Sequence, residues 1–98
     1  MTGEVPTMSE VKDNPAESRF ELATPDGLAV IAYRRSGNRV ELIHTEVPEA
    51  LSGHGVGSRL VRGALDQLRA RGARIVPRCE FVAAYLERHP EYRDLVAA

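Results

Sequence analysis

The chain has 98 residues, of which 43% are hydrophobic and 28% are charged, and its formal net charge is −1. This length supports one domain, and the composition is typical of a globular chain. A single cysteine excludes an internal disulfide. The sequence also lacks both a run of about 18 apolar residues, which a membrane span needs, and a signal peptide. We therefore expect a cytoplasmic protein without a membrane partner.

Residues 1–18 are predicted to be a flexible acidic leader, and residues 19–98 a single folded domain. The leader carries four acidic residues, one lysine and two prolines, and it has almost no periodic apolar pattern.

Three strands are predicted over residues 19–23, 28–34 and 39–47, because apolar residues alternate there and turn-forming sequences separate them. Pro48 ends the third strand, since proline cannot continue a central ladder. Strict alternation predicts two faces for this strand, with Val40, Leu42, His44 and Glu46 on one and Ile43, Thr45 and Val47 on the other.

An amphipathic helix is predicted to begin near Val56 or Gly57 and to end at Arg71 and Gly72. A short strand follows over residues 73–76, and then a second helix over about 79–89. Its expected inward residues are Phe81, Val82, Tyr85 and Leu86. The order β-β-β-α-β-α indicates an α/β (α+β) fold, with a mixed sheet of about four to five strands and two main helices.

A loop with alternate glycines, Gly53, Gly55 and Gly57, lies directly before the first helix. The first N–H groups of a helix lack helical acceptors, and the helix dipole places partial positive charge there. Because glycines leave these donors accessible, the loop is a candidate phosphate or pyrophosphate site. It is not a P-loop, because no Gly-Lys-Ser/Thr follows, and too little chain remains for a dinucleotide fold.

Residues 57–78 contain six arginines and one aspartate. This run is either a solvated helix face or a site for an anionic ligand. Nucleic acid would bind such a site in a salt-sensitive manner, but the net charge and the small number of aromatic residues argue against it.

The glycine loop resembles the acetyl-coenzyme A motif of the GCN5-related N-acetyltransferase (GNAT) superfamily, Gln/Arg-x-x-Gly-x-Gly/Ala. Gly55 and Gly57 match its glycines, and Ser52 replaces its first residue. Three segments, HTEVP (44–48), PRCEFVAAY (77–85) and HPEY (89–92), are similar to the minimal YidJ/NATD1-like subfamily. The resemblance covers about residues 19–94 and implies a curtailed GNAT fold without the usual N-terminal helices.

The resemblance implies that acetyl-coenzyme A is a co-substrate and that an amine, either a small molecule or a protein lysine, is the acceptor. The implied coenzyme-binding residues are Thr45, Glu46, Val47, Gly53, His54, Gly55, Val56, Gly57, Ser58, Arg59 and Cys79. The alternative function is a non-catalytic module that binds coenzyme A and has a regulatory or interaction role. A monomer or a weak homodimer, paired through an exposed sheet edge, is expected.

Four residues are candidates for catalysis. His44 and Glu46 are candidate bases; the alternatives are a partly buried histidine and a solvated carboxylate. Tyr85 resembles the superfamily's general acid, or it is a core aromatic residue. Cys79 precedes a helix, where the thiolate is favoured. It either accepts the acetyl group, protonates the leaving thiolate or lines the pocket.

No metal site is predicted, because His44, His54, Cys79 and His89 lack the short spacing of metal ligands.

Overall fold

The computed structural model describes residues 11–51, 53 and 55–97. Its strands are β1 (Val11–Asn14), β2 (Arg19–Thr24), β3 (Gly27–Ser36), β4 (Arg39–Glu46) and β5 (Arg74–Pro77). Its helices are α1 (Val56–Ala70) and α2 (Glu80–Arg88), with two 3₁₀ segments, η2 (Glu49–Leu51) and η3 (Pro90–Leu95).

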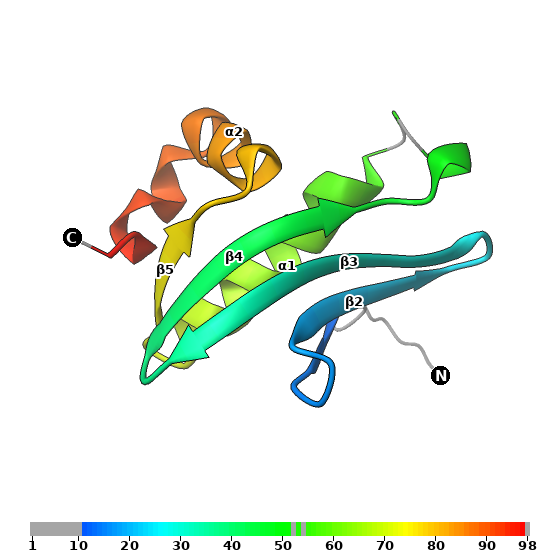
Figure 1. Ribbon diagram of the computed structural model, residues 1–98. Helices are drawn as coiled ribbons and strands as arrows, with labels where there is room; N and C mark the ends of the chain where they lie inside the picture. The colour runs from blue at the N-terminus through cyan, green and yellow to red at the C-terminus, as the bar shows by residue number, and fades with distance from the viewer. Residues whose placement is uncertain (1–10, 52, 54, 98) are drawn as a thin grey trace, which may run out of the picture.

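The strands form one sheet in the order β1-β2-β3-β4-β5, in which only the β4–β5 pair is parallel (Figure 1). The predicted mixed sheet with two main helices is therefore confirmed. None of the described helices is long and apolar enough to cross a membrane.

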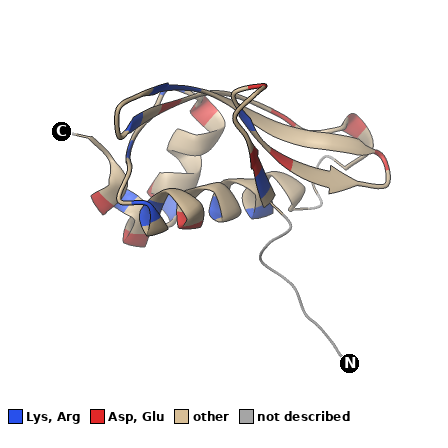
Figure 2. Cartoon of the chain, turned by 90° about the horizontal axis from the view of Figure 1, so that it is seen from below, with Lys and Arg blue, Asp and Glu red and all other residues tan. Residues whose placement is uncertain are grey.

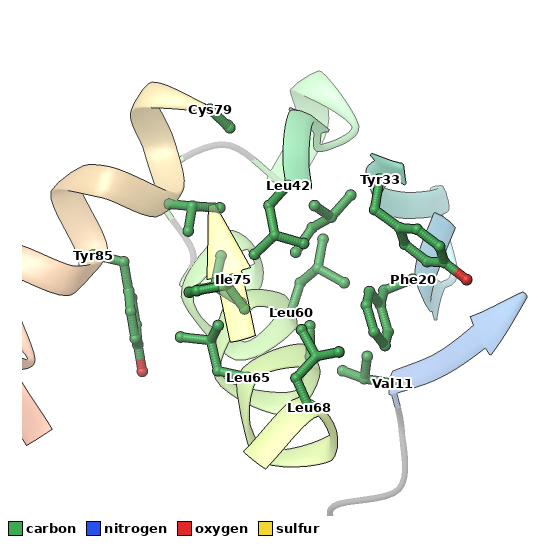
Figure 3. Close-up of a cluster of buried hydrophobic side chains, with 14 of the residues drawn as sticks. Val11, Phe20, Tyr33, Leu42, Leu60, Leu65, Leu68, Ile75, Cys79 and Tyr85 are labelled. Carbon is green, nitrogen blue, oxygen red and sulfur yellow. The ribbon is translucent and has the colours of Figure 1, made fainter. Parts of the chain in front are cut away.

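The two helices lie on the same side of the sheet, which arches over α1 (Figure 2). The apolar stripe of α1 packs against the inward side chains of β2, β3, β4 and β5 (Figure 3). Leu60, Leu65 and Ile75 are completely buried. Burying each such side chain contributes about 1.5–3 kcal/mol. The opposite face of the sheet is not covered by any described helix.

Strand β1 corrects the prediction of a leader over residues 1–18. Residues 1–10 lie outside the described residues, but Val11–Asn14 pairs with β2. Val11 is buried, and its carbonyl oxygen accepts a hydrogen bond of 2.6 Å from Gln67. Asp13 lies 2.9 Å from the Arg71 guanidinium and accepts a hydrogen bond from Tyr33. These partners are distant in sequence, so the local pattern of residues 11–14 gave no sign of the strand.

A β-bulge in β4 corrects the predicted faces of this strand. Ala32 of β3 pairs with His44, and Tyr33 pairs with Leu42, so Ile43 is an additional residue. A bulge of this kind reverses the alternation. Leu42 therefore points toward the core, whereas His44 and Glu46 are exposed on the uncovered face. His44 and Glu46 share a face of β4, as predicted, but Leu42 lies on the opposite face.

Three of the six arginines in residues 57–78 contact the C-terminal segment or β1. Arg69 binds both carboxylate oxygens of Asp94 at 3.0 Å, and it also donates to the Glu91 carbonyl oxygen. Arg74 donates to the Asp94 carbonyl oxygen, and Arg71 pairs with Asp13. These three arginines therefore hold η3 and β1 in place.

The close approach of β1 to α1 at Gly63 gives a test of the corrected fold. A Cβ at residue 63 would lie 2.7 Å from the Cβ of Val11. Glycine-to-alanine substitutions inside helices usually stabilise by about 0.5–1 kcal/mol. We expect Gly63→Ala to destabilise instead, by about 1–3 kcal/mol, as measured by urea unfolding. In a Val11→Ala background most of this loss should disappear; equal stabilisation in both backgrounds would show that β1 does not pack there.

Tyr33 makes stability depend on pH in the alkaline range. Burial, together with its hydrogen bond to Asp13, raises the pKa of Tyr33 to about 12. A tyrosine in the unfolded chain has a pKa of about 10. The stabilisation is therefore complete below about pH 10 and is lost as the pH rises toward about 12. Urea unfolding at about pH 9 and about pH 11 should show a smaller loss of stability in Tyr33→Phe than in the wild type; an equal loss would contradict this.

Candidate functional site

A pocket of about 300 Å³ opens at the N-terminus of α1. It brings together six of the predicted coenzyme-binding residues, namely Val47, Gly53, Gly55, Val56, Gly57 and Ser58. Leu51, Phe81 and Arg88 complete its lining. His54 and Ser52 lie outside the described residues. Arg59 is exposed on the first turn of α1 and is not among the residues that line the pocket.

The start of α1 is built to leave its backbone N–H groups accessible. Gly55 has a φ of 77°, a left-handed conformation that favours glycine, and no side chain caps the helix. The first turn contains no acidic residue that would neutralise the positive end of the helix dipole. The pocket at this end therefore suits an anionic group such as a phosphate.

Phe81 forms one wall of the pocket, which corrects the prediction that it points into the core. Its side chain is 40% exposed, and a Cβ at Gly57 would lie 2.5 Å from its ring. Glycine at residue 57 thus lets the aromatic ring of α2 approach α1.

Arg88, from the last turn of α2, brings a positive charge to the same pocket. The sequence gave no local signal for Arg88, because it lies far along the chain from the glycine loop.

Strands β4 and β5 separate beside this pocket. Their parallel pairing runs from Arg39 to Leu42 on β4 and ends there. The Leu42 carbonyl oxygen accepts hydrogen bonds from the backbone N–H groups of Arg78, at 3.0 Å, and Cys79, at 2.9 Å. Beyond this point the chain turns into α2, so the final residues of β4 have no strand partner on that side within the described part of the chain.

Cys79 and Thr45 meet where the two strands separate. The Cys79 sulfur lies 3.2 Å from the Thr45 hydroxyl oxygen. Cys79 is the residue that precedes α2, and it is 8% exposed. The thiol therefore lies at the edge of the core, above the cluster in Figure 3.

His44 and Glu46 form a pair on the uncovered face of the sheet. The His44 Nε2 atom lies 3.1 Å from the Glu46 Oε2 atom, and their side chains are 62% and 69% exposed. His44 is therefore not the partly buried histidine of the alternative prediction. Because the bulge reverses the alternation, this pair and Thr45 point to opposite sides of β4.

Tyr85 is not brought together with Cys79. It is 2% exposed and stacks on the His89 ring with a centroid distance of 4.1 Å. Its hydroxyl group points away from Cys79 (Figure 3). Burial raises the pKa of Tyr85 above its ordinary value, so the phenol is neutral at neutral pH. This placement is that of a core aromatic residue.

The fold and the site define a class of small α+β proteins in which an accessible helix N-terminus lies beside two diverging parallel strands. A family model described as "GCN5-related N-acetyl-transferase" matches residues 19–95. The chain belongs to this family, as the sequence motifs predicted.

Related proteins and a solved structure agree with this membership. The chain is 35% identical over 63 residues to Protein NATD1 of chicken (Gallus gallus) and of mouse (Mus musculus). This match covers 63% of the chain and 57% of each relative, so it spans little more than half of their length. The solution NMR structure of a candidate GCN5-like N-acetyltransferase from Staphylococcus aureus is 29% identical. It has a TM-score of 0.69 and covers 91% of this chain and 88% of that one.

Proposed function

We propose that the protein is an N-acetyltransferase that moves an acetyl group from acetyl-coenzyme A to an amine. The observation that carries this proposal is the contact between Cys79 and Thr45 at the separation of β4 and β5. Each of these residues lies two positions before a residue that lines the glycine-lined pocket, Phe81 and Val47. Family membership supports acyl transfer in general. The identity of the donor as acetyl-coenzyme A and of the acceptor as an amine is the part that we propose.

The donor would lie with its pyrophosphate at the N-terminus of α1. The accessible N–H groups after Gly55 and the guanidinium of Arg88 supply donors and positive charge there. Val47 lines the pocket and lies two residues after Thr45, which corresponds to about 7 Å along an extended chain. The arm of the donor would therefore extend past Val47 and Phe81 and place its thioester beside Thr45 and Cys79.

Amide formation requires that the amine lose a proton and that the departing thiolate gain one. His44 and Glu46 share a short contact on the uncovered face, so this pair would accept the proton of the amine. At the end of β4, which has no strand partner on the β5 side, backbone N–H groups would polarise the thioester oxygen.

Two roles of Cys79 fit its position. As a proton donor, its S–H group would protonate the departing thiolate. As a nucleophile, its sulfur would form a bond to the acetyl carbon while the donor's carbon–sulfur bond breaks, and the amine would then attack this new thioester. The orientation of Tyr85 favours Cys79 over Tyr85 as the group that meets the departing thiolate.

Turnover of labelled acetyl-coenzyme A with a panel of amines tests this function. Cys79→Ala should reduce kcat by about 10²-fold or more, because no group then meets the thiolate. Cys79→Ser keeps a hydroxyl proton donor, so it should recover part of the activity if Cys79 acts as an acid and none if it is a nucleophile. A labelled acetyl adduct on Cys79 identifies the nucleophile. Coenzyme binding with no amine turned over would instead support the binding module.

Arg88 gives a test of the donor site that does not depend on turnover. Because a hydrogen bond to a charged group contributes about 1.5–3 kcal/mol, Arg88→Gln should weaken coenzyme A binding about tenfold or more in calorimetry. Arg93→Gln removes an exposed arginine that lies outside the pocket and serves as the matched control. Equal affinities for the two variants would place the phosphates elsewhere.

A further inference from the structure

A second cavity, of about 650 Å³, lies on the sheet away from the glycine-lined pocket. It is lined by Pro15, Ser18, Tyr33, Arg34, Arg35 and Ile43. These residues come from the β1–β2 turn, the second half of β3 and the bulge of β4. We call it the bulge cavity. None of its residues lines the pocket at α1.

Two irregular backbone features shape the bulge cavity. Ser18 has a φ of 55°, the only positive φ of a residue other than glycine in the described part of the chain. Its carbonyl oxygen accepts a hydrogen bond of 2.9 Å from the Tyr33 N–H group, which fixes the turn against β3. Ile43 is the additional residue of β4. Strained conformations and bulges of this kind are frequent beside binding sites, where they position side chains.

The bulge cavity adjoins the candidate catalytic residues across β4. Ile43 directly precedes His44 and directly follows Leu42, whose carbonyl oxygen binds the Cys79 N–H group. The cavity lies on the β3 side of β4, whereas Cys79 lies on the β5 side. Neighbouring strands are about 4.8 Å apart. A molecule in the cavity would therefore reach past His44 to the thioester position through a chain of several bonds.

The lining of the bulge cavity is positively charged and contains no acidic residue. Arg34 is 74% exposed, and its contact with Glu41 is long, at 3.9 Å, so this contact contributes little. Arg35 makes no ion pair with any residue in the described ranges. Guanidinium groups bind carboxylates and phosphates through paired hydrogen bonds. Pro15 and Ile43 add apolar surface for a hydrocarbon chain.

We propose that the bulge cavity holds the anionic end of the acceptor, so that the preferred substrate is an amine with a carboxylate or phosphate several bonds away. This inference rests on the proposed acetyl transfer and narrows its substrate class. Arg34, which pairs with Glu41 and points to the same uncovered face as His44, binds the anion, while the amine lies at His44 and Glu46. Polyamines, which carry a second positive charge in place of the anion, are then poor acceptors.

The test compares four acceptors with a common six-carbon chain: hexylamine, 1,6-diaminohexane, 6-aminohexanoate and 6-aminohexyl phosphate. We expect kcat/KM to be about tenfold or more higher for the two anionic amines, mainly through KM. Arg34→Gln should remove this preference, and Arg93→Gln should keep it. The carboxylate and phosphate compounds show which anion the cavity prefers. Acetylation of all four amines with equal kcat/KM would overturn the inference and leave the proposed transferase intact.

A second measurement does not require turnover. Amide chemical shifts of the wild-type protein are followed during titration with 6-aminohexanoate, and with hexylamine as the control. Changes at Ser18, Arg34 and Ile43 with the carboxylate alone support the bulge cavity, even if no amine is acetylated and the proposed function fails. Equal changes with both compounds, or none at these residues, would overturn the inference.

Discussion

The carbonyl oxygen of Leu42 is the point on which the arrangement of the site depends. It accepts the N–H groups of both Arg78 and Cys79, and with these two bonds the parallel pairing of β4 and β5 ends. The chain after β5 therefore leaves the sheet and begins α2, while β4 continues alone on that edge. This separation brings the Cys79 thiol beside Thr45 and brings Phe81 of α2 against the start of α1.

The bulge at Ile43 determines which side of β4 each chemical group occupies. Without it, strict alternation would place His44 and Glu46 toward the helices, beside the core. With it, Thr45 points toward Cys79, and the His44–Glu46 pair is exposed on the uncovered face. Donor and acceptor would then approach β4 from opposite sides, so the two substrates need not compete for one cleft. Under the proposed function, this arrangement would give a chain of 98 residues two binding regions.

Some arginines form ion pairs within the fold, and others line a cavity. The position of an arginine in the fold, and not its position in the sequence, decides which group it belongs to. Within the arginine-rich segment, Arg69 and Arg71 are joined to Asp94 and Asp13, so part of the local positive charge is neutralised inside the molecule. Arg88, at the glycine-lined pocket, and Arg34 and Arg35, at the bulge cavity, lie outside that segment. The density of positive charge along the chain therefore does not indicate which arginines line the two cavities.

The sequence by itself determined the order of the elements from β2 onward and the position of the glycine-lined pocket. Apolar periodicity and turn residues are local properties, and the accessible N–H groups at the start of α1 require only glycines before a helix. Tertiary structure decided that β1 forms, because β1 pairs with β2 and also contacts α1 through the bond between Gln67 and Val11. It likewise decided that Phe81 and Arg88 reach the pocket, because α2 must first pack beside it. It also decided the face of His44, since a bulge arises from the register between two strands and leaves no mark in either strand alone.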